Sequence, residues 1–169
     1  MSKIDRRAIR QGSWLLMYVK NQTDEVCLQA VRQDGRALEF VHNQTHEICV
    51  EAVKENGMAF QFVKNQTPEI CLEAVRNRGE ALRFVRGQTE EICLEAVKQN
   101  GLALYHARNQ TEEMCLEAVT GRADALKYVK DQTLRVCLAA AKENRSEALE
   151  QIVDPAMVCQ IIEILDTRT

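Results

Sequence analysis

A 22-residue period constrains this chain more than any other feature of its sequence. Gln-Thr pairs recur at that interval, beginning at Gln22, Gln44, Gln66, Gln88, Gln110 and Gln132. The cysteines follow the same interval, at Cys27, Cys49, Cys71, Cys93, Cys115, Cys137 and Cys159. Self-similarity at a fixed period indicates a repeat architecture, in which each unit buries its apolar face only against its neighbours. The period therefore predicts a stack of units.

Local chemistry divides each unit into two helices. The threonine of the Gln-Thr pair is a good N-cap, because its hydroxyl accepts a hydrogen bond from a first-turn amide. In one unit Thr67 precedes Pro68, which is the favoured first helical residue. We expect the first helix to run for about ten residues and to stop near a glycine in the left-handed conformation, as at Gly57. A second, shorter helix follows, with Ala-Leu-x-Phe-Val supplying its apolar face.

The apolar face of the first helix is wider than a helix on a single layer needs. At about 100° per residue, an arc of roughly 200° is covered by Ile92, Cys93, Leu94, Ala96 and Val97. A helix that packs on one layer shows a stripe near about 100°. We therefore expect each first helix to lie between its own partner helix and the next unit. This predicts an all-α solenoid of stacked helical hairpins.

The whole chain, residues 1–169, is predicted to form a single repeat domain with atypical ends. Residues 4–21 form a divergent first unit, in which Trp14 is expected to cover the end of the core. Residues 22–153 hold six repeats. Residues 154–169 form a capping helix whose frame slips by about one residue, since terminal repeats are generally atypical.

The motif Gln-Thr-x-Glu-Ile-Cys-Leu-Glu-Ala-Val-Lys-Gln-Asn-Gly-x-Ala-Leu occurs almost residue for residue from Gln88 to Leu104. It resembles the repeat of a bacterial and viral family of short, two-helix units classed as a domain of unknown function. The resemblance covers roughly residues 20–153. It implies a helical repeat fold and no catalytic residues. Proteins with such repeats include some that look like pathogen effectors or phage products, which implies a role in binding other molecules.

The cysteines are interpreted as small, buried apolar residues stacked in a column. Neighbouring helix layers lie about 8–10 Å apart, whereas a disulfide needs Cα atoms within about 7 Å. Zinc is disfavoured because there is no Cys-x-x-Cys pair and no histidine in phase with the cysteines. We expect no metal and no cofactor. Free thiols are typical of a reducing compartment, so the expected location is the cytoplasm, or the host cytosol for a delivered protein.

The Asn-Gln-Thr tripeptides formally match the glycosylation acceptor motif. We interpret them as the end of one helix and the cap of the next, with Asn or Gln side chains hydrogen-bonded between units. Charges recur as well: Glu73 and Glu95 each precede a cation, Arg76 or Lys98, by three residues. These columns are interpreted as a solvated helix face with mutual support of a few tenths of a kcal/mol per pair, on the order of 0.2–0.5.

Composition excludes several functional classes. A formal charge of −3 gives no general attraction to nucleic acid or anionic membranes. We expect no membrane segment, since no apolar stretch approaches transmembrane length and the first residues lack the apolar run of a signal peptide. No phosphate-binding glycine loop, metal-spaced cluster or nucleophile triad occurs in the sequence. We therefore predict no catalytic residues and no enzymatic activity.

The leading functional hypothesis is a non-catalytic scaffold that binds another protein. Repeats combine a constant framework with outward residues that vary. Met58, Leu102 and Tyr105 are apolar where equivalent residues are charged, so we predict that they contact the partner. His106 stands where other units carry a repeated aromatic residue, interpreted as a core column. It indicates either local repacking or a specialised pocket, and we include it among the predicted partner contacts.

A basic column supports an alternative function, nucleic-acid binding. Its candidate phosphate contacts are Lys64, Arg86, Arg108 and Lys130, with His42 in the same phase. Neutralisation of helix dipoles explains the same residues. A third alternative is a structural or oligomerising spacer, distinguished by a featureless surface and self-association.

Overall fold

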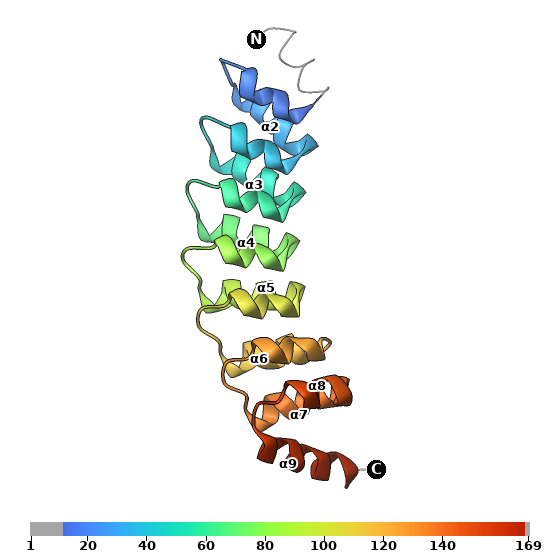
Figure 1. Cartoon of the computed structure of the whole chain (residues 1–169). Helices are drawn as coiled ribbons and strands as arrows, with labels where there is room; N and C mark the ends of the chain where they lie inside the picture. The colour runs from blue at the N-terminus through green and yellow to red at the C-terminus, as the bar shows by residue number, and fades with distance from the viewer. Residues whose placement is uncertain (1–11, 168–169) are drawn as a thin grey trace. The chain divides into compact units, whose positions relative to one another are not determined.

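A computed structural model describes residues 12–167, and all regular structure within that range is helical. It falls into two units, Met1–Gly87 and Gln88–Thr169, which are described separately. In both, the α-helices labelled in Figure 1 alternate with six-residue 3-10 helices, which are given the symbol η in the text. This confirms the predicted all-α solenoid of short repeats.

The first unit consists of two packed layers. Its elements are η1 (Ser13–Tyr18), α2 (Asp24–Gln33), η2 (Gly35–Phe40), α3 (His46–Glu55), η3 (Gly57–Phe62), α4 (Pro68–Asn77) and η4 (Gly79–Phe84). The α-helices form one layer, in which α3 packs against both α2 and α4. The 3-10 helices form the other layer, in which η3 packs against η2 and η4.

The second unit continues the alternation and then departs from it. Its elements are α5 (Glu90–Gln99), η5 (Gly101–His106), α6 (Glu112–Val119), η6 (Ala123–Tyr128), α7 (Leu134–Glu143), α8 (Arg145–Gln151) and α9 (Pro155–Asp166). Here α6 packs between α5 and α7, and η5 packs against η6. After η6 the short α8 takes the place of a 3-10 helix, and α9 packs on α7.

The threonine caps form as predicted. In α4 the Thr67 hydroxyl accepts from the Ile70 amide at 3.4 Å, and Pro68 occupies the first turn. The threonines before α3, α5, α6 and α7 cap their helices in the same way. The capped helices are ten residues long, except for α6, which has eight.

The predicted role of the glycines is wrong. Among residues 12–167 only Gly121 has a positive φ, of 94°. Gly57 instead begins η3 after the extended residue Asn56, whose φ is −147°. A β-carbon on Gly57 would lie 2.6 Å from the carbonyl oxygen of Ala74 in the next α-helix. Glycine is needed there because the next repeat approaches too closely for a side chain.

The core lies between the two layers. In α3, in η3 and at the residue directly after η3, the buried side chains are Ile48, Cys49, Val50, Ala52, Val53, Ala59, Phe60 and Val63. Full burial of an aliphatic or aromatic side chain contributes about 1.5–3 kcal/mol. Most of this burial depends on contacts with neighbouring repeats, because a single hairpin leaves both of its flanks open.

At the N-terminal side, η1 lies one period before η2 and is its counterpart. Leu16 is buried, as Leu38 is in η2. Trp14, predicted to cover the end of the core, is 53% exposed, and Tyr18 is 69% exposed. The rest of the predicted first unit, from residue 4 to residue 11, lies outside the described residues.

At the C-terminal side the repeat changes register. In η6 the Ala125 amide bonds to the residue three positions back, whereas the Ala148 amide in α8 bonds four positions back, to Asn144. Relative to the period, α8 ends one residue later than η6, but only three residues separate α8 from α9, against five between η6 and α7, so α9 begins one residue early. Val158 consequently takes the place that Cys137 has in α7, since each donates its amide to the N-cap carbonyl.

This shift confirms the predicted frame slip and corrects the interpretation of the cysteines. The six earlier ones, from Cys27 to Cys137, are buried. Cys159 is exposed, because a displacement of one residue rotates its side chain by about 100° around the helix.

Candidate functional site

The glutamines of the Gln-Thr pairs join neighbouring repeats. Gln44 Nε2 donates to the carbonyl oxygens of Leu38 and Phe62 at 3.3 and 2.9 Å, and Oε1 accepts from the Lys64 amide at 3.0 Å. Equivalent hydrogen bonds are made by Gln22, Gln110 and Gln132. Each bonds to the short helix before it and to the end of the short helix in the next repeat. This confirms the predicted ladder, and its glutamines satisfy backbone groups rather than a ligand.

The basic column makes backbone contacts in the first unit. Lys64 Nζ donates to the carbonyl oxygens of Val41 and His42 at 3.4 and 3.1 Å. Arg86 Nη2 donates to the Lys64 carbonyl at 3.0 Å. These carbonyls lie at or just after the end of the preceding 3-10 helix, where helix dipoles are negative.

The second unit follows the same pattern. Lys130 Nζ donates to the carbonyls of Ala107 and Arg108, at 3.2 and 2.7 Å. The Arg108 amide donates to Gln88 Oε1 at 2.9 Å, and its side chain is exposed. The geometry agrees with dipole neutralisation as a use of these cations. A phosphate would have to compete with carbonyls for Lys64, Arg86 and Lys130.

An aromatic patch, comprising Tyr105, His106 and Tyr128, lies on the η layer of the second unit. Tyr105 is 65% exposed. Its ring centroid lies 5.1 Å from that of His106, with the planes at 70°, and 5.1 Å from that of Tyr128, with the planes at 57°. The Lys127 ammonium lies 5.0 Å from the Tyr128 centroid, within cation-π distance. The patch thus combines three rings and one cation.

The predicted core position of His106 is wrong. Its side chain is half-buried, whereas Leu104, two residues earlier, is fully buried and faces the core. The repeated aromatic position is half-buried in the other units as well, as at Phe62 and Phe84. His106 therefore belongs to the rim between core and surface, where it supports Tyr105.

The structure brings together part of the predicted contact set. Leu102 is half-buried in η5, three residues before Tyr105, a spacing that places side chains on the same side of a 3-10 helix. Met58 is half-buried at the equivalent position of η3, which belongs to the other unit. Tyr128 was missed from the sequence. It occupies a framework position usually held by phenylalanine, and only its hydroxyl distinguishes it there.

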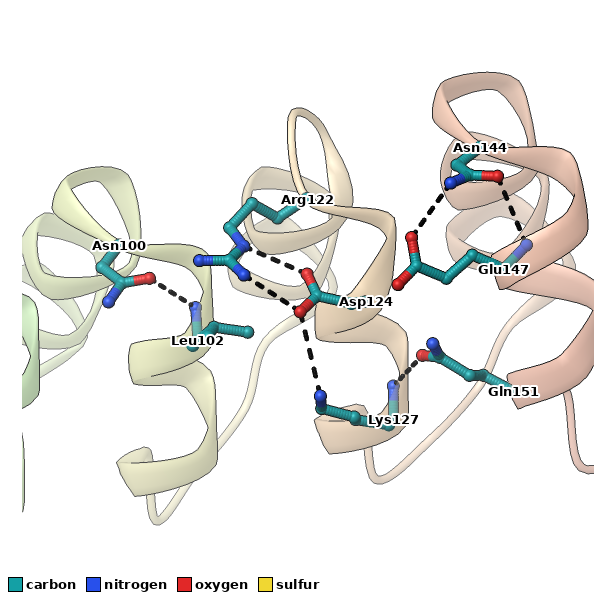
Figure 2. Close-up of polar contacts among 8 residues, drawn as sticks. All are labelled: Asn100, Leu102, Arg122, Asp124, Lys127, Asn144, Glu147 and Gln151. Carbon is teal, nitrogen blue, oxygen red and sulfur yellow. Dashed lines mark hydrogen bonds and ion pairs between the residues drawn. The ribbon is translucent and has the colours of Figure 1, made fainter.

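Polar contacts hold η6 in place and join it to α8 (Figure 2). Arg122 donates two hydrogen bonds to the Asp124 carboxylate, each 3.0 Å long, and these raise the pKa of Arg122. Lys127 Nζ lies 3.8 Å from the same carboxylate. Gln151 Oε1 in α8 accepts from the Lys127 amide at 2.9 Å. These contacts fix η6 and hence the ring of Tyr128.

The buried thiols are held in their neutral form. Burial raises the pKa of Cys49, Cys71, Cys93 and Cys115 and raises that of Cys137 to about 11. A thiol, not a thiolate, predominates at neutral pH, and the thiolate is the reactive species. Cys49 Sγ lies 3.8 Å from Gln44 Oε1, its weak hydrogen-bond acceptor. The thiols therefore act as part of the core.

Residues 12–167 contain neither a metal-ligand cluster nor a membrane-spanning helix. No cluster of three or more His, Cys, Asp or Glu side chains in this range is placed to hold a metal ion. Helices in the described part of the chain are also too short or too polar to span a bilayer.

Alternating α and 3-10 helices, joined by a glutamine ladder, define the chain as an α-solenoid repeat protein. It belongs to the family described as Domain of unknown function (DUF4116). The family model matches four overlapping windows whose starts follow the 22-residue period, at residues 23–67, 45–88, 67–111 and 89–135. Each window spans two repeats, in agreement with the predicted resemblance. No curated protein and no solved structure matches the chain.

Proposed function

We propose that this chain is a non-catalytic scaffold that binds another protein through the aromatic patch of its second unit. The observation that carries the proposal is Tyr105, whose largely exposed ring contacts the rings of His106 and Tyr128. Tyrosine is enriched among the residues that dominate binding energy at protein interfaces. It presents a large apolar face together with a hydroxyl and loses little conformational entropy on binding.

Hydrogen bonds near the aromatic patch also hold its helices in position before a partner binds. Asn100 Oδ1 accepts from the Leu102 amide at 3.1 Å and so fixes the start of η5, as Figure 2 shows. The positions equivalent to Tyr105 in the other repeats carry polar or charged residues: Glu39, Gln61, Arg83 and Lys127. A preorganised side chain reduces the cost of ordering an interface. Tyr105 thus differs from its counterparts in the other repeats, is largely exposed and is held in place by its neighbours.

Site-specific photo-crosslinking tests this proposal. A benzoylphenylalanine is placed at Tyr105, and in a matched chain at Gln61, which is exposed at the same position of an earlier repeat. Crosslinking in the cells that naturally hold the protein should join position 105, but not position 61, to a discrete second protein. Tyr128→Ala should weaken the adduct from position 105. The absence of a protein adduct at position 105, or equal adducts at both positions, would contradict the proposal.

The proposed setting is a reducing compartment, the cytoplasm or a host cytosol. Its support is the set of six buried, protonated thiols, which need no oxidation to serve as core residues. Fractionation of the same cells tests this location. Recovery of the chain from an oxidising compartment would contradict it.

Nucleic-acid binding is the less well supported alternative. The cations Lys64, Arg86 and Lys130 already donate to backbone carbonyls. Binding by phosphate contacts would require affinity that falls steeply with salt. Retention of the chain on DNA or RNA at low ionic strength, lost on adding salt, would favour this alternative.

A further inference from the structure

The outer face of α7 departs from the repeat. Two glutamates mark this face in each of α3, α4, α5 and α6, four residues apart, as at Glu91 and Glu95 in α5. In α7 the equivalent residues are Arg135 and Ala139. The two acidic columns therefore end at α7, and its face is cationic and apolar instead.

A groove opens between α6 and α7 where this change occurs. Its volume is about 310 Å³. The half-buried side chains of Leu116, Leu138 and Ala139 line it, and exposed Arg135, Lys142 and Glu143 flank it. Two features create the space: α6 is two residues shorter than the ten-residue α5 and α7, and Ala139 is small.

The groove lacks a carboxylate that other repeats supply themselves. In α5 the Lys98 ammonium lies 3.6 Å from Glu95 Oε1, and α4 has the same i,i+3 pair between Arg76 and Glu73. Lys142 occupies the position of Lys98, but three residues before it stands Ala139. Within residues 12–167, no acidic side chain forms an ion pair with Lys142. Arg135 does have one, at 3.1 Å to Glu112.

We propose that this groove binds an acidic peptide segment of a partner protein. An apolar side chain of the peptide packs against Leu116, Leu138 and Ala139. A carboxylate next to it takes the place beside Lys142 that Glu95 takes beside Lys98. Charge complementarity at Lys142 favours this occupant, because this ammonium faces the groove without the i,i+3 carboxylate that pairs with Lys98, whereas Arg135 is already paired with Glu112. The groove lies on the α layer and does not depend on the aromatic patch.

Peptide selection tests the proposal with the full chain. A phage-displayed library of random dodecapeptides is selected against the wild type, and enriched peptides are measured by fluorescence anisotropy. We expect peptides that combine aspartate or glutamate with an adjacent large apolar residue. Ala139→Glu should weaken their binding on the order of tenfold, because it fills the groove and pairs with Lys142 internally.

Ala139→Glu restores the residue that other repeats carry, so it should leave the fold intact, which its urea midpoint checks. Lys142→Glu should weaken binding similarly, by repulsion. Lys98→Glu, at the same position of α5, is the matched control and should leave the affinity unchanged. Tyr105→Ala should also leave it unchanged, which separates this site from the aromatic patch.

Three outcomes would overturn the proposal. The first is selection that enriches no peptide, or only peptides without carboxylates. The second is undiminished binding to the Ala139→Glu chain. The third is self-association of the wild type, seen by sedimentation and lost in Ala139→Glu, which would assign the groove to a second copy of this chain.

Discussion

Gly57 packs so closely against the carbonyl oxygen of Ala74 that a β-carbon on the glycine would lie 2.6 Å from that oxygen. Gly101 and Ala118 show the same relationship in the second unit, at 2.5 Å. The spacing of α3 from α4, and of α5 from α6, thus depends on the absence of a side chain at the start of the 3-10 helix between them. The glycine acts on the next repeat rather than on its own backbone conformation.

Gly57→Ala should therefore destabilise the chain by about 1–3 kcal/mol, the usual cost of overpacking. Gly87→Ala is the matched control, since a β-carbon there meets no atom within 4 Å and its φ is not positive. It should be neutral or stabilise by about 0.5 kcal/mol through the unfolded state. Urea unfolding followed by circular dichroism measures both. Equal midpoints for the two variants would show that the close approach carries no energetic weight.

Gln44→Ala should lower the free energy of unfolding by about 2 kcal/mol, because the Phe62 carbonyl and the Lys64 amide lose their partner. Gln44→Glu should fall between this variant and wild type, since it keeps the acceptor and loses the donor. Asn43→Ala, at the exposed neighbouring position, should change stability by less than about 0.5 kcal/mol. Urea titrations measure the free energy of unfolding of these three variants. A Gln44→Ala chain as stable as Asn43→Ala would refute the ladder's contribution.

Cys159 should be the single rapidly reacting thiol of the native chain. Its side chain is exposed, whereas the other six cysteines are buried and Cys137, for example, has a raised pKa. Ellman's reagent should modify one thiol quickly and the remaining six only on unfolding. Cys159→Ser should remove the fast phase alone. A fast phase that survives this substitution would mean that a supposedly buried thiol is accessible.

Alkaline pH should destabilise the chain through its buried thiols. Burial raises the pKa of Cys137 from an ordinary 9.0 to about 11, so the folded state holds the proton more tightly than the unfolded state. The stabilisation that the folded state gains from the protonated Cys137 thiol is complete below pH 9.0. It is lost progressively as the pH rises toward about 11. Urea midpoints across this range should fall less steeply for Cys137→Ala than for wild type.

The exposed Cys159→Ala serves as the control in that comparison. It should follow the wild-type pH profile, since this side chain is exposed and its replacement leaves the six buried thiols in place. Matching profiles for Cys137→Ala and wild type would assign the alkaline loss to other groups.

Helix starts and the repeat itself were predictable because their signals are local. A threonine such as Thr67 caps the helix that follows directly, and its hydroxyl needs a partner only three residues away. The i,i+3 pairing of Glu95 with Lys98 followed from helix geometry alone. Periodicity then indicated that units stack, since one unit leaves its apolar faces open.

Parts of the candidate site were not predictable. Tyr128 lies at a framework position, and its contact with Tyr105 arises only when η5 and η6 pack side by side. His106 stands at a position that is aromatic in the other repeats. The sequence does not state whether this position or that of Leu104, two residues earlier, is the fully buried one. The groove at Ala139 was overlooked because a missing carboxylate leaves no motif.

The sequence by itself determined the repeat, the threonine caps, the order of long and short helices and the burial of most cysteines. These follow from periodicity and from interactions within a few residues. Tertiary structure alone decided why glycine stands at Gly57, why Cys159 faces solvent and which side chains surround Tyr105. Each of these depends on distances between repeats or on the shortened linker between α8 and α9, and both are set by how the helices pack.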